Sequence, residues 1–229
     1  KTKPGDKLFI GDVELEITQI GKKCHGDGCE IFSQVGKCVM PKEGIFAKVI
    51  KTGKIKAGDE VKYLPKVIKI QIITLSDRAS KGEYKDLSGP KIYEMITNYY
   101  KSLEMEYFVD HQIIPDDASM LKDLLLNARD EMYDVVITTG GTGIGPRDIT
   151  IETVRPLLDK EIPGIMEMIR IKYGQEKPNA LLSRGVAGVM GQTLVYTLTG
   201  SVKGVQEYMT EIIKTLQHLI YMLHGIDAH

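Results

Sequence analysis

The sequence predicts an α/β protein in which helices flank a mostly parallel sheet, preceded by a small N-terminal all-β segment. Two observations support this fold class. From residue 65 onward, strand-like apolar runs alternate with stretches of helical spacing. The first 64 residues instead show period-two alternation and glycine-rich turns, without helical periodicity. The chain is therefore expected to contain two domains, residues 1–64 and 65–229.

The composition is that of an ordinary globular protein. The chain has 229 residues, of which 42% are hydrophobic and 27% are charged. Its 30 basic and 31 acidic side chains nearly cancel, which favours a small-molecule partner over nucleic acid or an anionic membrane. We find no apolar run near the roughly 20 residues of a membrane span and no secretory signal pattern, so a cytoplasmic location is expected.

The N-terminal segment is predicted to form short strands. Apolar residues alternate with polar ones over 13–17, 45–49 and 61–63, the pattern of strands with one buried face. Turns at 52–54 and 57–59 separate the later strands. About 60 residues is few for an independent core, so this segment is expected to be incomplete or to pack against a neighbour.

All three cysteines lie in this segment, and His25 adjoins the first: Cys24, Cys29 and Cys38. Three interpretations stay open: ordinary free cysteines, zinc ligands together with His25, or a reactive thiol on a glycine-rich loop. The spacing Cys24-x4-Cys29 is looser than the usual paired Cys-x2-Cys, which disfavours zinc.

The second part alternates strand and helix in chain order. Apolar runs predict strands over 67–75, 135–139 and 194–198, and the strand-like stretch 106–114 predicts a fourth. Helical spacing predicts helices after Ser88, over 120–128, after Thr150, over 165–173 and after Ser201. The three hydroxyl residues are the expected N-caps, and Pro90 suits a first turn.

Four polar clusters follow the predicted strands, at 76–80, 115–117, 138–148 and 199–201. Parallel strands bring their carboxyl ends to one edge of a sheet, so these clusters are expected to converge there. The third contains Thr138-Thr139-Gly140-Gly141-Thr142-Gly143. Glycines allow close approach of an anion, and the next helix N-terminus favours it, so a phosphate-bearing ligand is predicted. A purely structural turn is the alternative, since the run is neither a dinucleotide fingerprint nor a P-loop.

Asp116 and Asp148 follow different strands and are expected to face the same pocket. Two carboxylates beside a phosphate would repel it unless a cation intervened, and Mg²⁺ takes one or two carboxylates plus phosphate oxygens. The ion would neutralise charge on a transferring phosphoryl group. As alternatives, Asp116 or Asp117 caps the following helix, and Asp148 pairs with Arg147 at the surface.

Ser183 and Arg184 occupy a loop after the predicted helix over 165–173. The Arg184 guanidinium suits an anionic group of a ligand, with a surface ion pair as the alternative. His111 and His224 have no partner that the sequence reveals, and no role is assigned to them.

Ordered motifs of this second part resemble the MogA/MoaB family. They are the runs 75–80, 114–116, 138–143, 147–150, 161–164 and 182–184. The resemblance implies a molybdopterin adenylyltransferase, which uses Mg²⁺ and ATP to transfer AMP to the terminal phosphate of molybdopterin and releases pyrophosphate. Family members are commonly trimers, so a homotrimer is expected. The resemblance also implies other molybdenum-cofactor biosynthesis proteins as partners.

The resemblance also implies roles for single residues. Asp116 and Asp148 match the catalytic, metal-linked aspartates of the family. The predicted substrate-binding residues are Ser76, Thr139, Gly140, Gly141, Thr142, Gly143, Ser183, Arg184, Gly200 and Ser201.

One motif departs from the family pattern. Residues 198–202 are Leu-Thr-Gly-Ser-Val, where the family usually has Leu-Pro-Gly-x-Pro. The loss of both prolines bears on the rigidity of this loop. The departure from the family pattern keeps a second hypothesis open, in which the chain is a non-catalytic protein that binds molybdopterin or its cofactor and passes it on. A third, a generic nucleotide-binding domain, explains the glycine turn but not the paired aspartates.

Residues 11–25, 38–49 and 56–59 resemble the C-terminal half of the MOSC domain of molybdenum-cofactor sulfurases. The resemblance implies part of a β-barrel that carries sulfur on a cysteine or binds the molybdenum cofactor. Cys24 best matches the family cysteine, so it is the predicted sulfur carrier.

Overall fold

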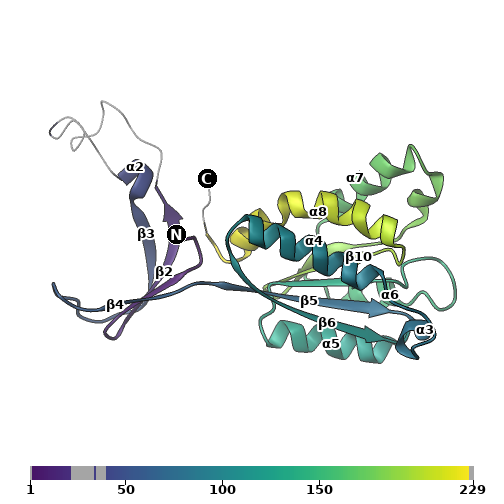
Figure 1. The fold of residues 1–229 in the computed structure, drawn as a ribbon, viewed down its shortest axis with the longest axis horizontal. Coiled ribbons are helices and arrows are strands. Elements are labelled where there is room, and N and C mark those ends of the chain that lie inside the picture. The colour runs from purple at the N-terminus through teal and green to yellow at the C-terminus, as the bar shows by residue number, and fades with distance from the viewer. Residues whose placement is uncertain (1, 22–33, 35–39, 227–229) are drawn as a thin grey trace. The chain divides into compact units, whose positions relative to one another are not determined.

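The computed structural model describes residues 2–21, 34 and 40–226 (Figure 1). The chain divides into two compact units, Lys1–Lys66 with Tyr221–His229, and Val67–Ile220. The predicted sulfur carrier Cys24, and with it His25, Cys29 and Cys38, lies outside the described residues.

The first unit contains a four-stranded antiparallel sheet in the order β3-β2-β1-β4. Its strands are β1 (Lys7–Ile10), β2 (Val13–Ile20), β3 (Ile45–Lys51) and β4 (Val61–Leu64). The three predicted strands are confirmed. The sequence did not predict β1, which pairs with both β2 and β4, or the short helix α2 (Met40–Glu43).

This unit has a small apolar core. Among its described residues before Val67, Val13 and Ile17 are the buried hydrophobic side chains. The buried carboxylate of Asp6 ties the end of β4 to the start of the chain, because it accepts hydrogen bonds from the Tyr63 hydroxyl at 2.6 Å and the Lys66 N–H at 2.9 Å. A polar anchor of this kind supplements the packing of so few apolar residues.

The second unit contains a six-stranded sheet in the order β6-β5-β7-β10-β9-β8. Its parallel strands are β5 (Val67–Leu75), β6 (Glu106–Ile114), β7 (Val135–Thr139) and β10 (Thr193–Leu198). These confirm the four predicted strands. The sheet as a whole is mixed, because β9 (Ala187–Met190) pairs antiparallel with β10, and β8 (Lys160–Glu161) pairs antiparallel with β9.

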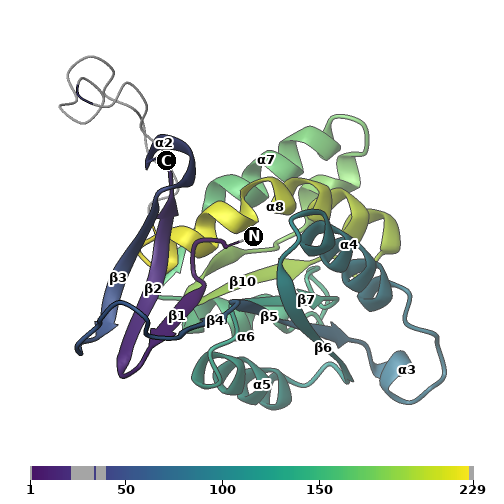
Figure 2. The same ribbon diagram turned by 60° about the vertical axis from the view of Figure 1, so that its left-hand side comes forward.

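Helices cover both faces of this sheet (Figures 1 and 2). One face carries α4 (Ser88–Ser102), α7 (Pro163–Gly174) and α8 (Val202–Leu223), and the other carries α5 (Ala118–Asp130) and α6 (Thr150–Val154). Short helical turns are α3 (Asp77–Ser80), η2 (Arg155–Leu157) and η3 (Pro178–Leu182). Because both faces are covered, β5 is buried without interruption from Ile70 to Leu75. Within the described ranges, each helix is too short or too polar to cross a membrane.

The helix starts correct two of the predicted N-caps. Leu87 precedes α4, and the carboxylate of Asp86, not Ser88, accepts hydrogen bonds from the first N–H groups of that helix. Thr150 is already helical, and its hydroxyl donates to the Gly140 carbonyl at 2.8 Å. The third prediction is confirmed, since Ser201 Oγ accepts from the Gly204 N–H at 3.2 Å.

Candidate functional site

The chain leaves β7 through a turn that requires glycine. Gly140 and Gly141 have φ angles of +100° and +61°, which side-chain-bearing residues rarely adopt. A Cβ on Gly140 would overlap the Leu75 carbonyl oxygen, so the turn passes directly over the end of β5. The Thr150 N–H donates to the Gly141 carbonyl at 3.1 Å, which fixes the start of α6 against the turn.

Asp148 closes the outer part of the turn. Its N–H donates to the Gly145 carbonyl at 3.0 Å, and its Oδ2 accepts from the Gly145 N–H at 2.7 Å. A Cβ on Gly143 would lie 2.7 Å from the same Oδ2. The carboxylate is thus held in one place, and its Oδ1 accepts no hydrogen bond from the described residues.

The structure brings Asp148 and Asp116 to the same hollow, of about 510 Å³, which Ser76 and Gly141 also line. Burial, and next the nearby carboxylate of Asp148, raise the pKa of Asp116 above its ordinary value. Asp117, rather than Asp116, caps α5, since its Oδ1 accepts from the Met120 N–H at 2.9 Å. The side chain of Asp116 therefore does not cap α5.

The two carboxylates have acceptor capacity to spare. An ionised carboxylate has about four acceptor sites. Within the described part of the chain, Asp116 accepts one long hydrogen bond of 3.4 Å and Asp148 accepts one of 2.7 Å. Among the described residues we find no group of three His, Cys, Asp or Glu side chains arranged as a metal site. The donor set suits Mg²⁺, which completes its coordination with water and substrate phosphates.

Asp77 lines the same hollow, although the sequence assigned it no role. Its Oδ1 accepts from the Asp116 N–H at 3.2 Å, and its own N–H donates to Asp116 Oδ2 at 3.4 Å. The guanidinium of Arg147 pairs with Asp77 instead of its sequence neighbour Asp148. Asp77 thus links the ends of β5 and β6 to the glycine turn. The sequence signal that could have pointed to Asp77 is its place in the polar cluster that follows the predicted strand 67–75.

A second hollow, of about 380 Å³, adjoins the first and shares Leu75, Ser76 and Arg78 with it. Its lining includes the predicted residues Thr139, Gly200 and Ser201. Both volumes fall in the range of ordinary small-molecule pockets. All four predicted clusters thus contribute residues to one or both of these hollows, at the carboxyl ends of parallel strands; the cluster 115–117 does so through Asp116.

Residues 71–218 match the family model described as "Probable molybdopterin binding domain". The chain belongs to the MogA/MoaB molybdopterin-binding family. The family predicted from the motifs is therefore confirmed. The first 70 residues lie outside the matched span, and the MOSC-like domain stays a prediction.

Relatives in this family extend over about two thirds of the chain. The protein named "Molybdopterin adenylyltransferase" from Pyrococcus furiosus is 42% identical over 159 residues, which are 67% of this chain and 89% of its own. "Gephyrin" from Dictyostelium discoideum is 34% identical over 68% of this chain, which spans only 22% of that longer protein. The crystal structure of the molybdopterin biosynthesis enzyme MoaB from Thermus thermophilus matches with a TM-score of 0.63 and 37% identity, over 69% of this chain and 98% of its own.

Two predicted residues of the molybdopterin-binding domain lie further along the sheet edge. Ser183 lines a third hollow, which shares Ser201 with the second, and accepts a hydrogen bond of 2.7 Å from the Tyr208 hydroxyl. Arg184 is engaged in the surface ion pair that the sequence left open, since one guanidinium nitrogen contacts both carboxylate oxygens of Glu152, at 2.6 and 2.7 Å. The backbone N–H of Arg184 donates to the Thr142 carbonyl at 3.3 Å.

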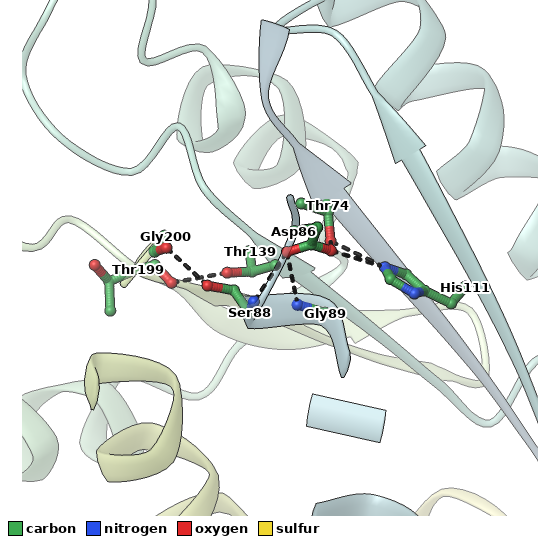
Figure 3. A network of polar contacts seen from close by, with 8 residues as sticks. All are labelled: Thr74, Asp86, Ser88, Gly89, His111, Thr139, Thr199 and Gly200. Carbon is green, nitrogen blue, oxygen red and sulfur yellow. Dashed lines mark hydrogen bonds and ion pairs between the residues drawn. The ribbon is translucent and has the colours of Figure 1, made fainter. Parts of the chain in front are cut away.

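A polar network that the sequence did not reveal lies beside the second hollow (Figure 3). Its centre is the carboxylate of Asp86, which the hydroxyl of Thr74 and the imidazole of His111 contact. The same Asp86 accepts from the N–H groups of Ser88 and Gly89. His111, to which no role was assigned, thus contacts two residues that line the hollow.

Proposed function

We propose that this molybdopterin-binding domain is an adenylyltransferase of molybdenum-cofactor biosynthesis, which transfers AMP from ATP to the terminal phosphate of molybdopterin. The observation that carries the proposal is the placement of Asp116 and Asp148. They come from different strand ends, share one hollow with the glycine turn, and retain free acceptor sites. The relative named "Molybdopterin adenylyltransferase" supports the reaction class.

In this reaction an oxygen of the molybdopterin phosphate attacks the α-phosphorus of ATP. The bond between that phosphorus and the bridging oxygen breaks, and pyrophosphate leaves. The left-handed glycines at 140 and 141 allow a phosphate to approach the backbone of the turn. Mg²⁺ held by Asp116 and Asp148 would neutralise charge on the transferring group. The hydroxyl of Ser76 accepts from the Ala79 N–H at 3.2 Å, which leaves its proton available to a ligand oxygen.

The second candidate function is a carrier that binds molybdopterin without adenylylating it. The hydrogen bonds of Asp148 with Gly145 favour it, because they give this aspartate a structural task in closing the turn. Under this hypothesis Asp148 shapes the pocket and takes no part in chemistry.

The test measures pyrophosphate release from molybdopterin, ATP and Mg²⁺. The native protein should release pyrophosphate, and Asp148→Asn should abolish release while still binding molybdopterin, because an asparagine oxygen can still accept the Gly145 N–H. Asp159→Asn is the matched control, since Asp159 holds the Gly191 N–H at 2.7 Å in another surface turn. Tight pterin binding by the native protein without pyrophosphate release would establish the carrier function instead.

We extend the proposal to the N-terminal segment and to assembly. Residues 1–64 form a MOSC-like domain that is separate from the domain 65–229. Its Cys24 carries sulfur as a persulfide. The whole chain assembles as a homotrimer. Mass spectrometry after incubation with a persulfide donor tests the first point, with Cys24→Ser as the control. Sedimentation equilibrium tests the assembly, and a monomer or dimer would contradict the trimer.

A further inference from the structure

Asp86 is a nearly buried carboxylate whose acceptor sites are all occupied. Its side chain is 6% exposed and lies on the loop between α3 and α4. Oδ1 accepts from the N–H groups of Ser88 at 2.9 Å and Gly89 at 3.1 Å. Oδ2 accepts from the Thr74 hydroxyl at 2.7 Å and lies 3.3 Å from Nε2 of His111. Four contacts fill the roughly four acceptor sites of a carboxylate, so Asp86 has no site left for a ligand or metal.

The contacts also assign the proton of His111. Thr74 Oγ1 has a single proton, and its shorter contact, 2.7 Å, is to Asp86 Oδ2. Nε2 of His111 lies 3.0 Å from the same Oγ1, which then acts as an acceptor. Nε2 must therefore carry a hydrogen, and His111 is the donor that completes the network.

This network reaches the wall of the second hollow through Ser88 (Figure 3). The N–H of Ser88 is held by Asp86, and its hydroxyl donates to the Gly200 carbonyl at 2.8 Å. On the other side, the Thr139 hydroxyl donates to the Thr199 carbonyl at 2.8 Å. Two hydroxyls on different elements thus hold the loop after β10, so a displaced α4 N-terminus would shift the Gly200 carbonyl.

We propose that Asp86 and His111 are positioning residues for the ligand of the second hollow. They fix the first turn of α4 against β5 and β6, and Ser88 transmits that position to the wall formed by Gly200 and Ser201. The inference rests on the proposed function only for the identity of the ligand. The shared chemistry is a phosphate-bearing fused heteroaromatic ring, supplied by either molybdopterin or ATP.

The test replaces the hydrogen-bond donor and then restores it. His111→Leu keeps the bulk of the side chain but removes the N–H, whereas His111→Gln retains an N–H near the original position. Binding is measured directly, by fluorescence titration with the pterin neopterin phosphate and with etheno-ATP plus Mg²⁺. His111→Leu should weaken the binding of one of the two probes about fivefold, the loss that one hydrogen bond of about 1 kcal/mol implies. His111→Gln should stay within about twofold of the native protein, and the second probe should be unaffected.

Two further variants keep the test decisive if His111→Leu fails to fold. Ser88→Ala removes only the hydrogen bond from the Ser88 hydroxyl to the Gly200 carbonyl and should weaken binding of the same probe. In the double variant of Ser88→Ala and His111→Leu, the loss of affinity should be smaller than the sum of the two single losses. Ser102→Ala is the matched control, because its hydroxyl donates to the Tyr99 carbonyl at 2.7 Å at the other end of α4. Native-like binding of both probes by Ser88→Ala and His111→Leu, or equal weakening of both probes, would overturn the proposal. Binding needs no turnover, so a protein that fails to adenylylate still tests the inference.

Discussion

Asp77 and Asp116 each bind the backbone of the other, through contacts of 3.2 Å and 3.4 Å between the carboxylate of one and the N–H of its partner. The register of β5 and β6 places Leu75 opposite Ile114, and each aspartate lies two residues after one member of this pair. The ion pair of Asp77 with Arg147 adds the glycine turn to this junction. One side chain thus connects three of the segments that line the first hollow.

Replacing Asp77 should therefore disturb Asp116 in a graded way. Asp77→Ala removes the acceptor for the Asp116 N–H and the partner of Arg147, whereas Asp77→Asn keeps an acceptor and loses only the charge. At about 1 kcal/mol for each interaction, kcat/KM for pyrophosphate release should fall about thirtyfold in the alanine variant and about fivefold in the asparagine variant. Equal activity of both variants and the native protein would show that Asp116 needs no such support.

The raised pKa of Asp116 predicts a response of stability to pH and to Mg²⁺. A carboxyl group whose pKa is raised on folding contributes stability that is fully present below its ordinary value of 3.8 and is lost as the pH rises through its folded-state pKa. Asp148→Asn removes the carboxylate charge that is the second cause of the raised pKa, so the loss of stability with rising pH should become smaller. Because a cation would offset the repulsion between Asp116 and Asp148, Mg²⁺ should raise the Tm of the native protein near pH 7.

Thermal melts from pH 3 to 8, with and without Mg²⁺, measure both effects. The Asp148→Asn variant should show the weaker pH dependence in this range and little response to Mg²⁺. A Tm of the native protein that does not change with Mg²⁺ at millimolar concentration would argue against a metal at these two carboxylates in the absence of ligand.

Glu211 on α8 predicts the opposite pH dependence. Burial alone would raise its pKa, but hydrogen bonds from Lys172, Lys214 and Tyr173 outweigh burial and bring the pKa to about 2. A carboxylate with a depressed pKa contributes stability that is present above its ordinary value of 4.5 and is lost as the pH falls toward 2. Glu211→Gln should therefore unfold more readily in urea at pH 7, by about 1–3 kcal/mol. Its stability should also vary less between pH 4.5 and 2, and an unchanged acid transition would contradict this role.

The sequence revealed what depends on local pattern. The strands β5, β6 and β7 have the predicted bounds. Apolar residues dominate β5 and β7, whereas β6 also contains Asp110, His111 and Gln112 and is strand-like because it is rich in aromatic and β-branched residues. In contrast, β9 was missed because Gly188 interrupts it, and the reason for that glycine is tertiary: a Cβ there would lie 2.5 Å from the Lys160 carbonyl oxygen in β8. A strand as short as β8 has no periodicity to detect.

The candidate site divides in the same way. Asp116 and Asp148 were predicted from their positions after strands and from a family resemblance. The partners that hold the site are distant in sequence: 39 residues separate Asp77 from Asp116, and 37 separate Thr74 from His111. Such pairs depend on the register between β5 and β6, which is a property of the two strands together and is not visible in the sequence pattern of either strand alone.

The glycine turn itself provides the last prediction. Gly140→Ala should destabilise the fold through two effects, about 1–2 kcal/mol for the left-handed backbone and about 1–3 kcal/mol for the overlap with the Leu75 carbonyl. Gly82→Ala is the matched control, because Gly82 has a φ of +74° but a Cβ there would meet nothing within 4 Å. Urea unfolding should therefore show a clearly larger loss at Gly140 than at Gly82. Equal losses at the two positions would mean that backbone conformation, and not the close approach of the turn to β5, is what requires glycine at the start of the site.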